Sequence, residues 1–439
     1  MMQKLYCRLF VVVIFCCAAL SSAHAIDIKE VTSPGGIKAW LVEAHGIPLI
    51  AMDFAFAGGA ALDPVGKEGT AKFITGMMDE GADDLDGPAF QAKRDKLSIQ
   101  ISFSHDKEGF YGSLNTLSKN RTDAFALLKK ALLKPRFSEE PMDRMRKFFT
   151  QEAQQDLKDP GNIASIAWLR QAFPNHSYGR SASGTAESFA TITVDDLRQL
   201  HKTLFSRSGM KIAVVGDIDA ANLGVLLDDV FGGLPNTPIP DPTTDVDVTA
   251  GPVTKIVPFD TPQTIILFGG KGIRDGDPGT YAAYLMAEII GGRASFSRFN
   301  TEVREKRGLT YGIGLSTNNL KRTGYVAGYL TTSNETAAEA LKVVKDVLRD
   351  MRDHGPSAQE LALAKTYLTG GYALRFDSNS SIASALLAMQ LQNYPVTHIE
   401  TRNDRVMAVT LEQVKEQSRN LLDPDKMIFT LVGKPVGME

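Results

Sequence analysis

Hydrophobic and polar positions alternate along parts of the first half of the chain with the two-residue period of a β-strand. The clearest stretch covers residues 49–57, where Phe54 and Phe56 fall on one face, and another covers residues 98–104. In residues 120–134 and 139–157 the hydrophobic positions recur at helical spacing instead. Because side chains alternate across a strand but repeat about every 3.6 residues around a helix, these patterns predict strands followed by helices.

The second half of the chain repeats this order of elements. Strand patterns lie around residues 264–268, 311–316 and 324–332, and helical patterns follow them. Ser357 and Glu360 have the spacing of a capping box, in which each of two side chains bonds to the backbone of the other residue. A helix is therefore predicted to begin at this point.

The two halves also share sequence. Residues 193–216 align without gaps on residues 410–433, and each segment combines a helix pattern with an apolar strand that ends in glycine. Between the halves, residues 235–262 hold seven of the twenty prolines of the chain, which is typical of a linker. We therefore expect two homologous α+β domains, each a mostly antiparallel sheet with helices packed on one face. The expected boundaries are a signal peptide at 1–25, a first domain at 26–234, the linker at 235–262 and a second domain at 263–439.

The first 25 residues have the pattern of a secretory signal. Lys4 and Arg8 precede an apolar run at 9–20, and Ala23-His24-Ala25 has the small residues that a signal peptidase recognises. All three cysteines lie within this segment, so a cleaved chain would keep no thiol. Export to the periplasm without stable membrane insertion is the expected outcome, and a lipid anchor on one of these cysteines is the alternative.

Charge gives little reason to expect a nucleic-acid partner. The chain has 48 basic and 51 acidic residues, a formal net charge of −3, and loss of the signal would make this about −5.

The usual catalytic motifs are missing from the sequence. There is no H-E-x-x-H or H-x-x-E-H, no G-x-S-x-G and no glycine loop that ends in Gly-Lys-Ser or Gly-Lys-Thr. The pair Gly291-Gly292 follows a helical pattern but lacks the spacing of a phosphate-binding loop. Because a helical zinc site needs two histidines four residues apart, the chain cannot build one of these sites locally.

Residues 291–314, GGRASFSRFNTEVREKRGLTYGIG, resemble the signature in the C-terminal half of insulinase-like, or pitrilysin-type, metallopeptidases, which include the mitochondrial processing peptidase. In that family an arginine and a tyrosine seven positions later reach the zinc site, where they hold the substrate and stabilise the reacting carbonyl oxygen. The matching residues are Arg304 and Tyr311. The resemblance also implies that the two domains form half of a clamshell chamber.

The zinc helix of that family should fall within residues 69–82, where the H-x-x-E-H positions are taken by Lys72, Thr75 and Gly76. Glu152, eight residues before Pro160, matches the family's more distant glutamate ligand. An ammonium at Lys72 repels a divalent cation and one carboxylate cannot hold zinc, so no metal or other cofactor is expected in this chain.

The resemblance leads to the hypothesis of a non-catalytic subunit in a periplasmic metallopeptidase complex. Its partner would be an H-x-x-E-H-bearing subunit that binds the zinc, their substrate an unfolded peptide, and Arg304 and Tyr311 would act in trans. The rival hypotheses are a periplasmic peptide-binding or scaffold protein of the same fold, and a hydrolase with an unrecognised site, which the missing motifs disfavour.

Overall fold

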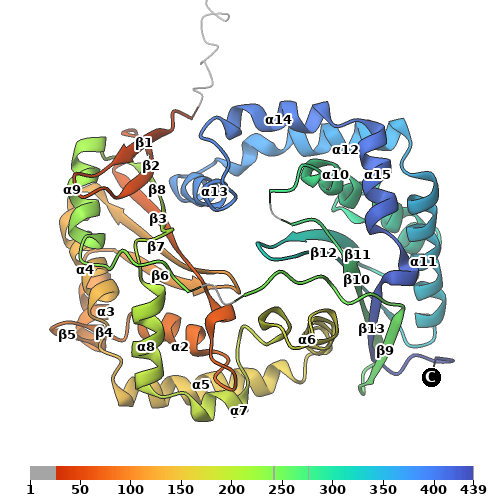
Figure 1. Ribbon diagram of the computed structural model, residues 1–439, viewed down its shortest axis with the longest axis horizontal. Helices are drawn as coiled ribbons and strands as arrows, with labels where there is room; N and C mark the ends of the chain where they lie inside the picture. The colour runs from red at the N-terminus through yellow and green to blue at the C-terminus, as the bar shows by residue number, and fades with distance from the viewer. Residues whose placement is uncertain (1–25, 241–242, 275, 439) are drawn as a thin grey trace, which may run out of the picture.

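The structure is a computed structural model that describes residues 26–240, 243–274 and 276–438, so the predicted signal peptide lies outside the described residues. Two halves lie side by side, each built around one β-sheet (Figure 1). This arrangement confirms the predicted α+β fold of two halves, which is also consistent with a clamshell.

The first sheet has six strands in the order β1-β2-β8-β3-β7-β6. All neighbours are antiparallel except β2 and β8, which are parallel. The strands are β1 (Lys29–Thr32), β2 (Lys38–Glu43), β3 (Leu49–Ala57), β6 (Gln100–His105), β7 (Gly109–Leu117) and β8 (Lys211–Gly216). The helices of this half are α2 (Thr70–Met77), α3 (Gly87–Lys96), α4 (Arg121–Leu133), α5 (Glu139–Asp156), α6 (Pro160–Ala172), α7 (Ala186–Thr191), α8 (Val194–Leu204) and α9 (Ala220–Phe231).

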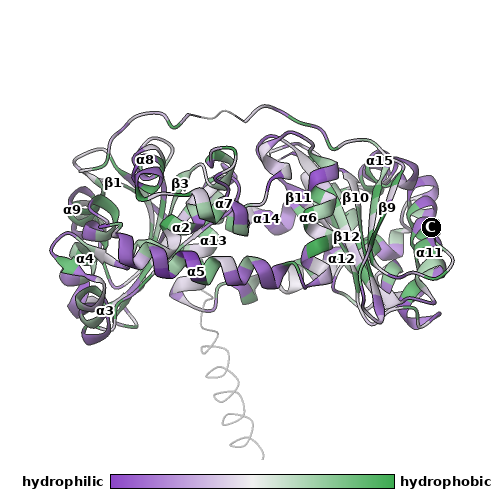
Figure 2. Ribbon diagram, turned by 90° about the horizontal axis from the view of Figure 1, so that it is seen from below, coloured by the Kyte–Doolittle hydropathy of each residue, from purple (hydrophilic) through white to green (hydrophobic). Residues whose placement is uncertain are grey.

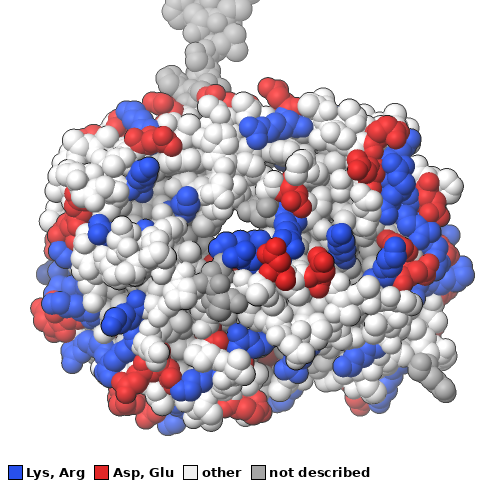
Figure 3. All heavy atoms as spheres, in the orientation of Figure 1, with Lys and Arg blue, Asp and Glu red and all other residues white. Residues whose placement is uncertain are grey.

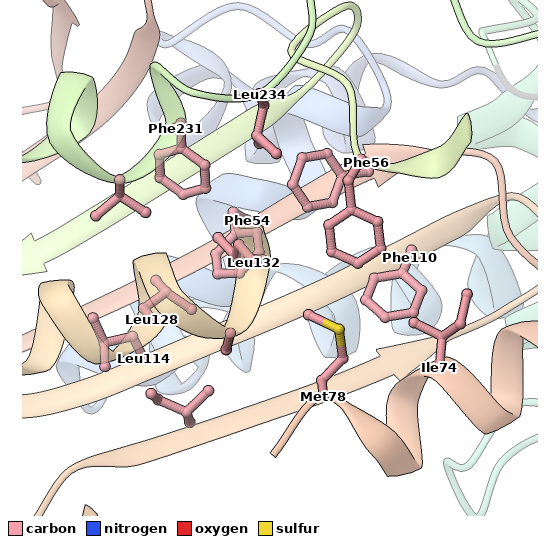
Figure 4. Close-up of a cluster of buried hydrophobic side chains, with 14 of the residues drawn as sticks. Phe54, Phe56, Ile74, Met78, Phe110, Leu114, Leu128, Leu132, Phe231 and Leu234 are labelled. Carbon is pink, nitrogen blue, oxygen red and sulfur yellow. The ribbon is translucent and has the colours of Figure 1, made fainter. Parts of the chain in front are cut away.

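Alternation along β3 separates the two faces of this sheet. Phe54 and Phe56 are fully buried and point, with Phe110 of β7, toward side chains of α2, α4 and α9 (Figure 4). The ring of Phe54 lies 5.4 Å from that of Phe231 on α9. The hydrophobic positions that predicted the strand therefore form its contact with the helical layer.

The second sheet has five strands in the order β11-β12-β10-β13-β9. Its strands are β9 (Val253–Pro258), β10 (Gln263–Lys271), β11 (Ile313–Asn319), β12 (Gly324–Ser333) and β13 (Ile428–Gly433), of which β9 and β13 are parallel. The helices of this half are α10 (Thr280–Gly291), α11 (Ala337–His354), α12 (Ala358–Gly370), α13 (Asn379–Leu391), α14 (His398–Ala408) and α15 (Leu411–Leu421). The predicted capping box at Ser357 and Glu360 is present at the start of α12, and β9 falls within the range expected to be a linker.

Each half contributes one helix to the sheet of the other half. Helix α6 packs against β10 and β13 of the second sheet, and α13 packs against β3 and β8 of the first. Trp168 of α6 donates a hydrogen bond from Nε1 to the carbonyl oxygen of Ile428 at 3.2 Å, and Gln390 of α13 donates from Nε2 to that of Ile212 at 2.8 Å. Helices therefore cover both faces of each sheet, one face from its own half and the other from the partner half, as Figures 1 and 2 show.

Hydrophobic and polar residues are distributed differently between the core and the outer surface. Hydrophobic colour is concentrated on the strands and on the helix faces beside them, whereas the outer helices carry more polar positions (Figure 2). Positive and negative side chains are intermixed over the face seen in Figure 3, which is hollowed between the two halves. Among the described residues, no helix is both long and apolar enough to cross a membrane.

Candidate functional site

Helix α2, which carries Lys72, Thr75 and Gly76, is held at its start by a buried aspartate. Oδ2 of Asp63 accepts a hydrogen bond from the backbone N–H of Gly69 at 2.7 Å, and Oδ1 accepts one from Ala71 at 2.9 Å. These bonds satisfy N–H groups that have no partner within the helix. Burial raises the pKa of Asp63 to about 7, although the two N–H donors oppose the shift. The cap fixes the position of α2 against the rest of the domain.

Lys72 and Glu152 form an ion pair between α2 and α5. The Nζ atom of Lys72 lies 2.9 Å from Oε2 of Glu152, and the Lys72 side chain is 14% exposed against 43% for Glu152. The same Nζ lies 4.9 Å from the centre of the Phe149 ring, close enough for a cation–π contact. Two positions that the sequence aligned with zinc ligands thus meet in space as an ammonium–carboxylate pair.

Thr75 and Gly76 have other surroundings. The Thr75 hydroxyl donates to the carbonyl oxygen of Lys72 at 2.7 Å, so its polar group is used within the helix. The Phe149 ring packs over Gly76, where a Cβ atom would lie 2.8 Å from Phe149 Cζ. A histidine at this position would overlap the ring. The sequence reasoning missed Phe149, although it stands three residues before Glu152 and so shares its helix face.

Metal ligands are not assembled around this ion pair. In the part of the chain that the structure describes, no group of three or more histidine, cysteine, aspartate or glutamate side chains could hold a metal. An ammonium–carboxylate pair lacks the Lewis acidity with which zinc polarises a carbonyl group or activates water. The arrangement links helices α2 and α5 through one ion pair.

Arg304 and Tyr311 lie in the second half on an exposed segment before β11. Arg304 belongs to the short π-helix η4 (Asn300–Glu305), a type of element that is frequent at functional sites, and its Nη1 donates to Oδ1 of Asn300 at 3.3 Å. Tyr311 is 91% exposed. The predicted strand began at this residue, but β11 begins at Ile313, so Tyr311 precedes the sheet and does not pack on it. Both side chains can therefore present donors to a molecule outside the chain.

Comparison with known proteins identifies the family. Residues 191–368 match the family model described as the peptidase M16 inactive domain. Over this region the chain is similar to the insulinase-like, or M16, peptidases. The resemblance found in the sequence is thereby confirmed, and the matched region is an inactive M16 domain.

Several relatives extend this likeness over most of the chain. The "Non-peptidase homolog YmxG" of Helicobacter pylori is 23% identical over 89% of this chain and 90% of its own length. The "Uncharacterized zinc protease Rv2782c" of Mycobacterium tuberculosis is 23% identical over 91% of this chain and 92% of its own length. Both kinds of name occur, so the relatives include a non-peptidase homolog as well as proteins named as proteases.

Solved structures share the fold. A crystal structure of a peptidase M16 inactive domain from Pseudomonas fluorescens has a TM-score of 0.87 and 27% identity, and it covers 94% of this chain and 99% of that one. A protease structure from Helicobacter pylori has a TM-score of 0.83 at 15% identity, with 93% of this chain and 100% of that one covered. The M16 architecture therefore extends well beyond residues 191–368.

Proposed function

We propose that this chain is the non-catalytic subunit of a periplasmic zinc metallopeptidase. It pairs with a second M16 subunit that carries an intact H-x-x-E-H motif, and it contributes Arg304 and Tyr311 to the joint site. The observation that carries this proposal is the contrast between the two candidate regions. The Lys72–Glu152 ion pair takes up the former metal position, whereas Tyr311 is 91% exposed at a position where the family uses a tyrosine.

The chemistry of the two exposed residues suits peptide hydrolysis by a partner. Zinc bound in the partner would supply the Lewis acid and the activated water. The Arg304 guanidinium is always charged and presents several N–H donors, and the Tyr311 hydroxyl adds another. Aimed at the carbonyl oxygen of the peptide bond, these donors stabilise the negative charge that develops there during attack. Neither residue needs a metal of its own for this role.

The periplasm is part of the proposal because of the secretory signal pattern at 1–25 and the absence of cysteine from residues 26–439. A peptidase subunit there would meet unfolded peptides, the substrate class proposed here.

The test reconstitutes cleavage with the H-x-x-E-H-bearing subunit, for which an M16 protein encoded by a neighbouring gene is the first choice. Arg304→Ala and Tyr311→Phe should each lower peptide turnover on the order of 10²-fold, the size of effect seen for a single oxyanion donor. Peptide affinity should change less, because these contacts strengthen mainly in the transition state.

The matched control is Arg307→Ala, in the same segment, because Arg307 is ion-paired with Glu302 at 2.8 Å. Zinc content and co-elution of the subunits on gel filtration should stay unchanged in all variants. Turnover within about twofold of wild type for both Arg304→Ala and Tyr311→Phe would contradict the proposed role and favour a scaffold protein without a part in catalysis.

A further inference from the structure

A cavity of about 1010 Å³ opens beside the segment that carries Tyr311. It lies between the end of α10, the strands β11 and β12, and the turn from α12 into η5 (Tyr372–Arg375). Four tyrosines contribute to its wall, namely Tyr284, Tyr329, Tyr367 and Tyr372. Aromatic rings pack against aliphatic chains and attract cations through their faces.

Glu288 of α10 is a buried acidic group in this wall. Glu288 is only 8% exposed, although it lines the cavity. Its Oε1 atom has no hydrogen-bond partner among the described residues. Burial raises the pKa of Glu288, while the Ala294 backbone N–H and the charge of Arg293 act in the opposite direction. A buried carboxyl oxygen without a partner destabilises the folded state, so its presence in a cavity wall suggests a ligand that pairs with it.

The glycine pair after α10 provides room for this carboxyl group. A Cβ atom on Gly292 would overlap the Glu288 carboxyl group, and one on Gly291 would lie 2.6 Å from the backbone nitrogen of Leu315 on β11. Gly292 has φ −66° and ψ 173°, which alanine also adopts. Glycine at 292 therefore leaves the space that the Glu288 carboxyl group occupies.

The other charged residues of the wall are placed differently. Arg293 and Arg375 are exposed, so water screens their charges at the rim of the cavity. Of the charged side chains that line the described part of the cavity, Glu288 is the buried one. A cation whose stem enters between the tyrosines would reach a carboxylate in surroundings of low dielectric constant, where their attraction is strong.

The position of the cavity relates it to the proposed peptide site. Residues 313–317 of β11 contribute to its wall, and β11 begins two residues after Tyr311. Among the described strands, β11 is an edge strand that pairs with β12 alone. An extended peptide advances roughly 3.3 Å per residue, so a peptide that contacts Tyr311 and follows this edge passes the cavity within a few residues.

We propose that this cavity is a specificity subsite for a lysine or arginine side chain of the peptide. Its aliphatic stem packs on the tyrosine rings and its cationic end pairs with the Glu288 carboxylate, whose Oε1 atom has no partner among the described residues. This inference depends on the proposed function in one respect, which is that the ligand is a peptide. Binding itself needs neither zinc nor the partner subunit.

The experiment measures peptide binding to the purified chain alone, residues 26–439, by fluorescence anisotropy. The probes are C-terminally labelled, unstructured Gly/Ser peptides with a single central lysine, or with norleucine, which has an aliphatic side chain without the ammonium. Each peptide is prepared with a free and with an acetylated N-terminus. Wild-type protein should bind both lysine peptides at least about 10-fold more tightly than the norleucine peptides, a preference typical of a charge-assisted contact.

Two variants locate this preference in the cavity. Glu288→Gln removes the charge, and Gly292→Ala keeps the charge but displaces the carboxyl group, because a Cβ atom would overlap it. Both should reduce the lysine preference to within about twofold, whereas Glu400→Gln, an exposed carboxylate on α14, should keep it. Glu288→Gln should also keep or raise the thermal midpoint, because the cost of burying a charge is removed. If Glu288→Gln fails to fold, the lysine preference of Gly292→Ala tests the proposal.

An unchanged lysine preference in folded Glu288→Gln or Gly292→Ala would overturn the proposal, as would equal affinity of wild type for the lysine and norleucine peptides. A preference that disappears on N-terminal acetylation alone would assign the cavity to a peptide terminus and also overturn it. The role of Arg304 and Tyr311 is tested separately by turnover with the partner on a peptide without lysine or arginine, so failure of one proposal is distinguishable from failure of the other.

Discussion

One side chain, Lys72, sets the charge at the position that the sequence comparison aligned with a zinc ligand. Lys72 introduces a fixed positive charge where the family aligns a metal ligand, and Glu152 neutralises it at 2.9 Å. The two partners differ in their exposure to water, because the lysine side chain is 14% exposed and the glutamate 43%. Loss of either partner should therefore have unequal effects.

We predict that Glu152→Gln lowers the free energy of unfolding by about 1 kcal/mol and that Lys72→Met lowers it by less. The first change leaves a largely buried ammonium without its counter-charge, whereas the second leaves a carboxylate that water can solvate. Urea unfolding followed by circular dichroism measures both. Glu140→Gln on the exposed face of α5 serves as control and should have little effect, and the reverse order of the two costs would contradict the prediction.

At the scale of elements, the packing of α5 on α2 blocks reconstruction of the zinc site. The Phe149 ring fills the space over Gly76 and contacts Phe73 of α2 edge to face, with 5.1 Å between ring centres. The family pattern requires histidine at Gly76. The glycine on α2 and the ring on α5 therefore fit together and leave no space for an imidazole at position 76.

The triple variant Lys72→His, Thr75→Glu, Gly76→His should consequently bind zinc poorly and have a lower thermal midpoint. Adding Phe149→Ala should make room for the new imidazole, and Glu152 then completes a His/His/Glu set. Zinc per chain, measured by elemental analysis after dialysis, should rise in the quadruple variant over the triple one. The control is a second quadruple variant in which Phe148→Ala takes the place of Phe149→Ala, because Phe148 is the neighbouring residue but is exposed. A quadruple variant that folds without a gain in zinc would show that the alignment of α2 is wrong.

Helix α8 carries a histidine that should make stability depend on pH. The Nε2 atom of His201 lies 3.0 Å from the carbonyl oxygen of Leu132 on α4, and its ring stacks on Phe205 at 4.2 Å. Burial lowers the pKa of His201 from 6.5 to about 4. Between these values the unfolded chain binds a proton that the folded chain does not, so folding is disfavoured as the pH falls.

We predict that the stability contributed by a neutral His201 is fully present above pH 6.5 and falls toward pH 4 by up to about 1.4 kcal/mol per pH unit. In His201→Gln, whose amide can still donate to Leu132, the free energy of unfolding should decline less over this range. Urea unfolding at several pH values measures the slope. His354→Gln at an exposed position should behave like wild type, and parallel pH profiles for His201→Gln and wild type would contradict the prediction.

At the scale of the whole molecule, the exchanged helices α6 and α13 join the halves. Trp168 of α6 is 1% exposed, and its ring lies 5.3 Å from that of Tyr325 on β12 of the second half. Ala383, Leu386 and Leu387 of α13 belong to an apolar cluster with residues of the first sheet, including Ala213 and Val215. Because each half covers an apolar face of the other, we expect them to unfold together.

Trp168→Ala should destabilise the whole chain by about 3–5 kcal/mol, the usual cost of removing a buried tryptophan. Trp40 is then the single tryptophan and reports on the first half, while far-ultraviolet circular dichroism reports on both. The two signals should change in one coincident transition at a lower urea concentration than in wild type. Trp40→Phe gives the matching measurement with Trp168 in place. Two separate transitions in the wild-type chain would show that the halves are independent.

The sequence by itself determined the features that depend on neighbouring residues. Alternation predicted β3, helical spacing predicted α4 and α5, and Ser357 with Glu360 marked the start of α12. The family and the missing H-x-x-E-H motif were also readable, because a motif is a property of the linear order. Residue spacing reports backbone periodicity and capping, which are local effects.

Only the tertiary structure decided which distant side chains meet. It placed Glu152 against Lys72, the Phe149 ring over Gly76, and α6 and α13 on the sheets of opposite halves. It also started β11 after Tyr311 and left the Oε1 atom of Glu288 without a described partner in a cavity wall. These outcomes depend on close packing and on exclusion of water between segments far apart in the chain, and neither leaves a local pattern in the order of residues.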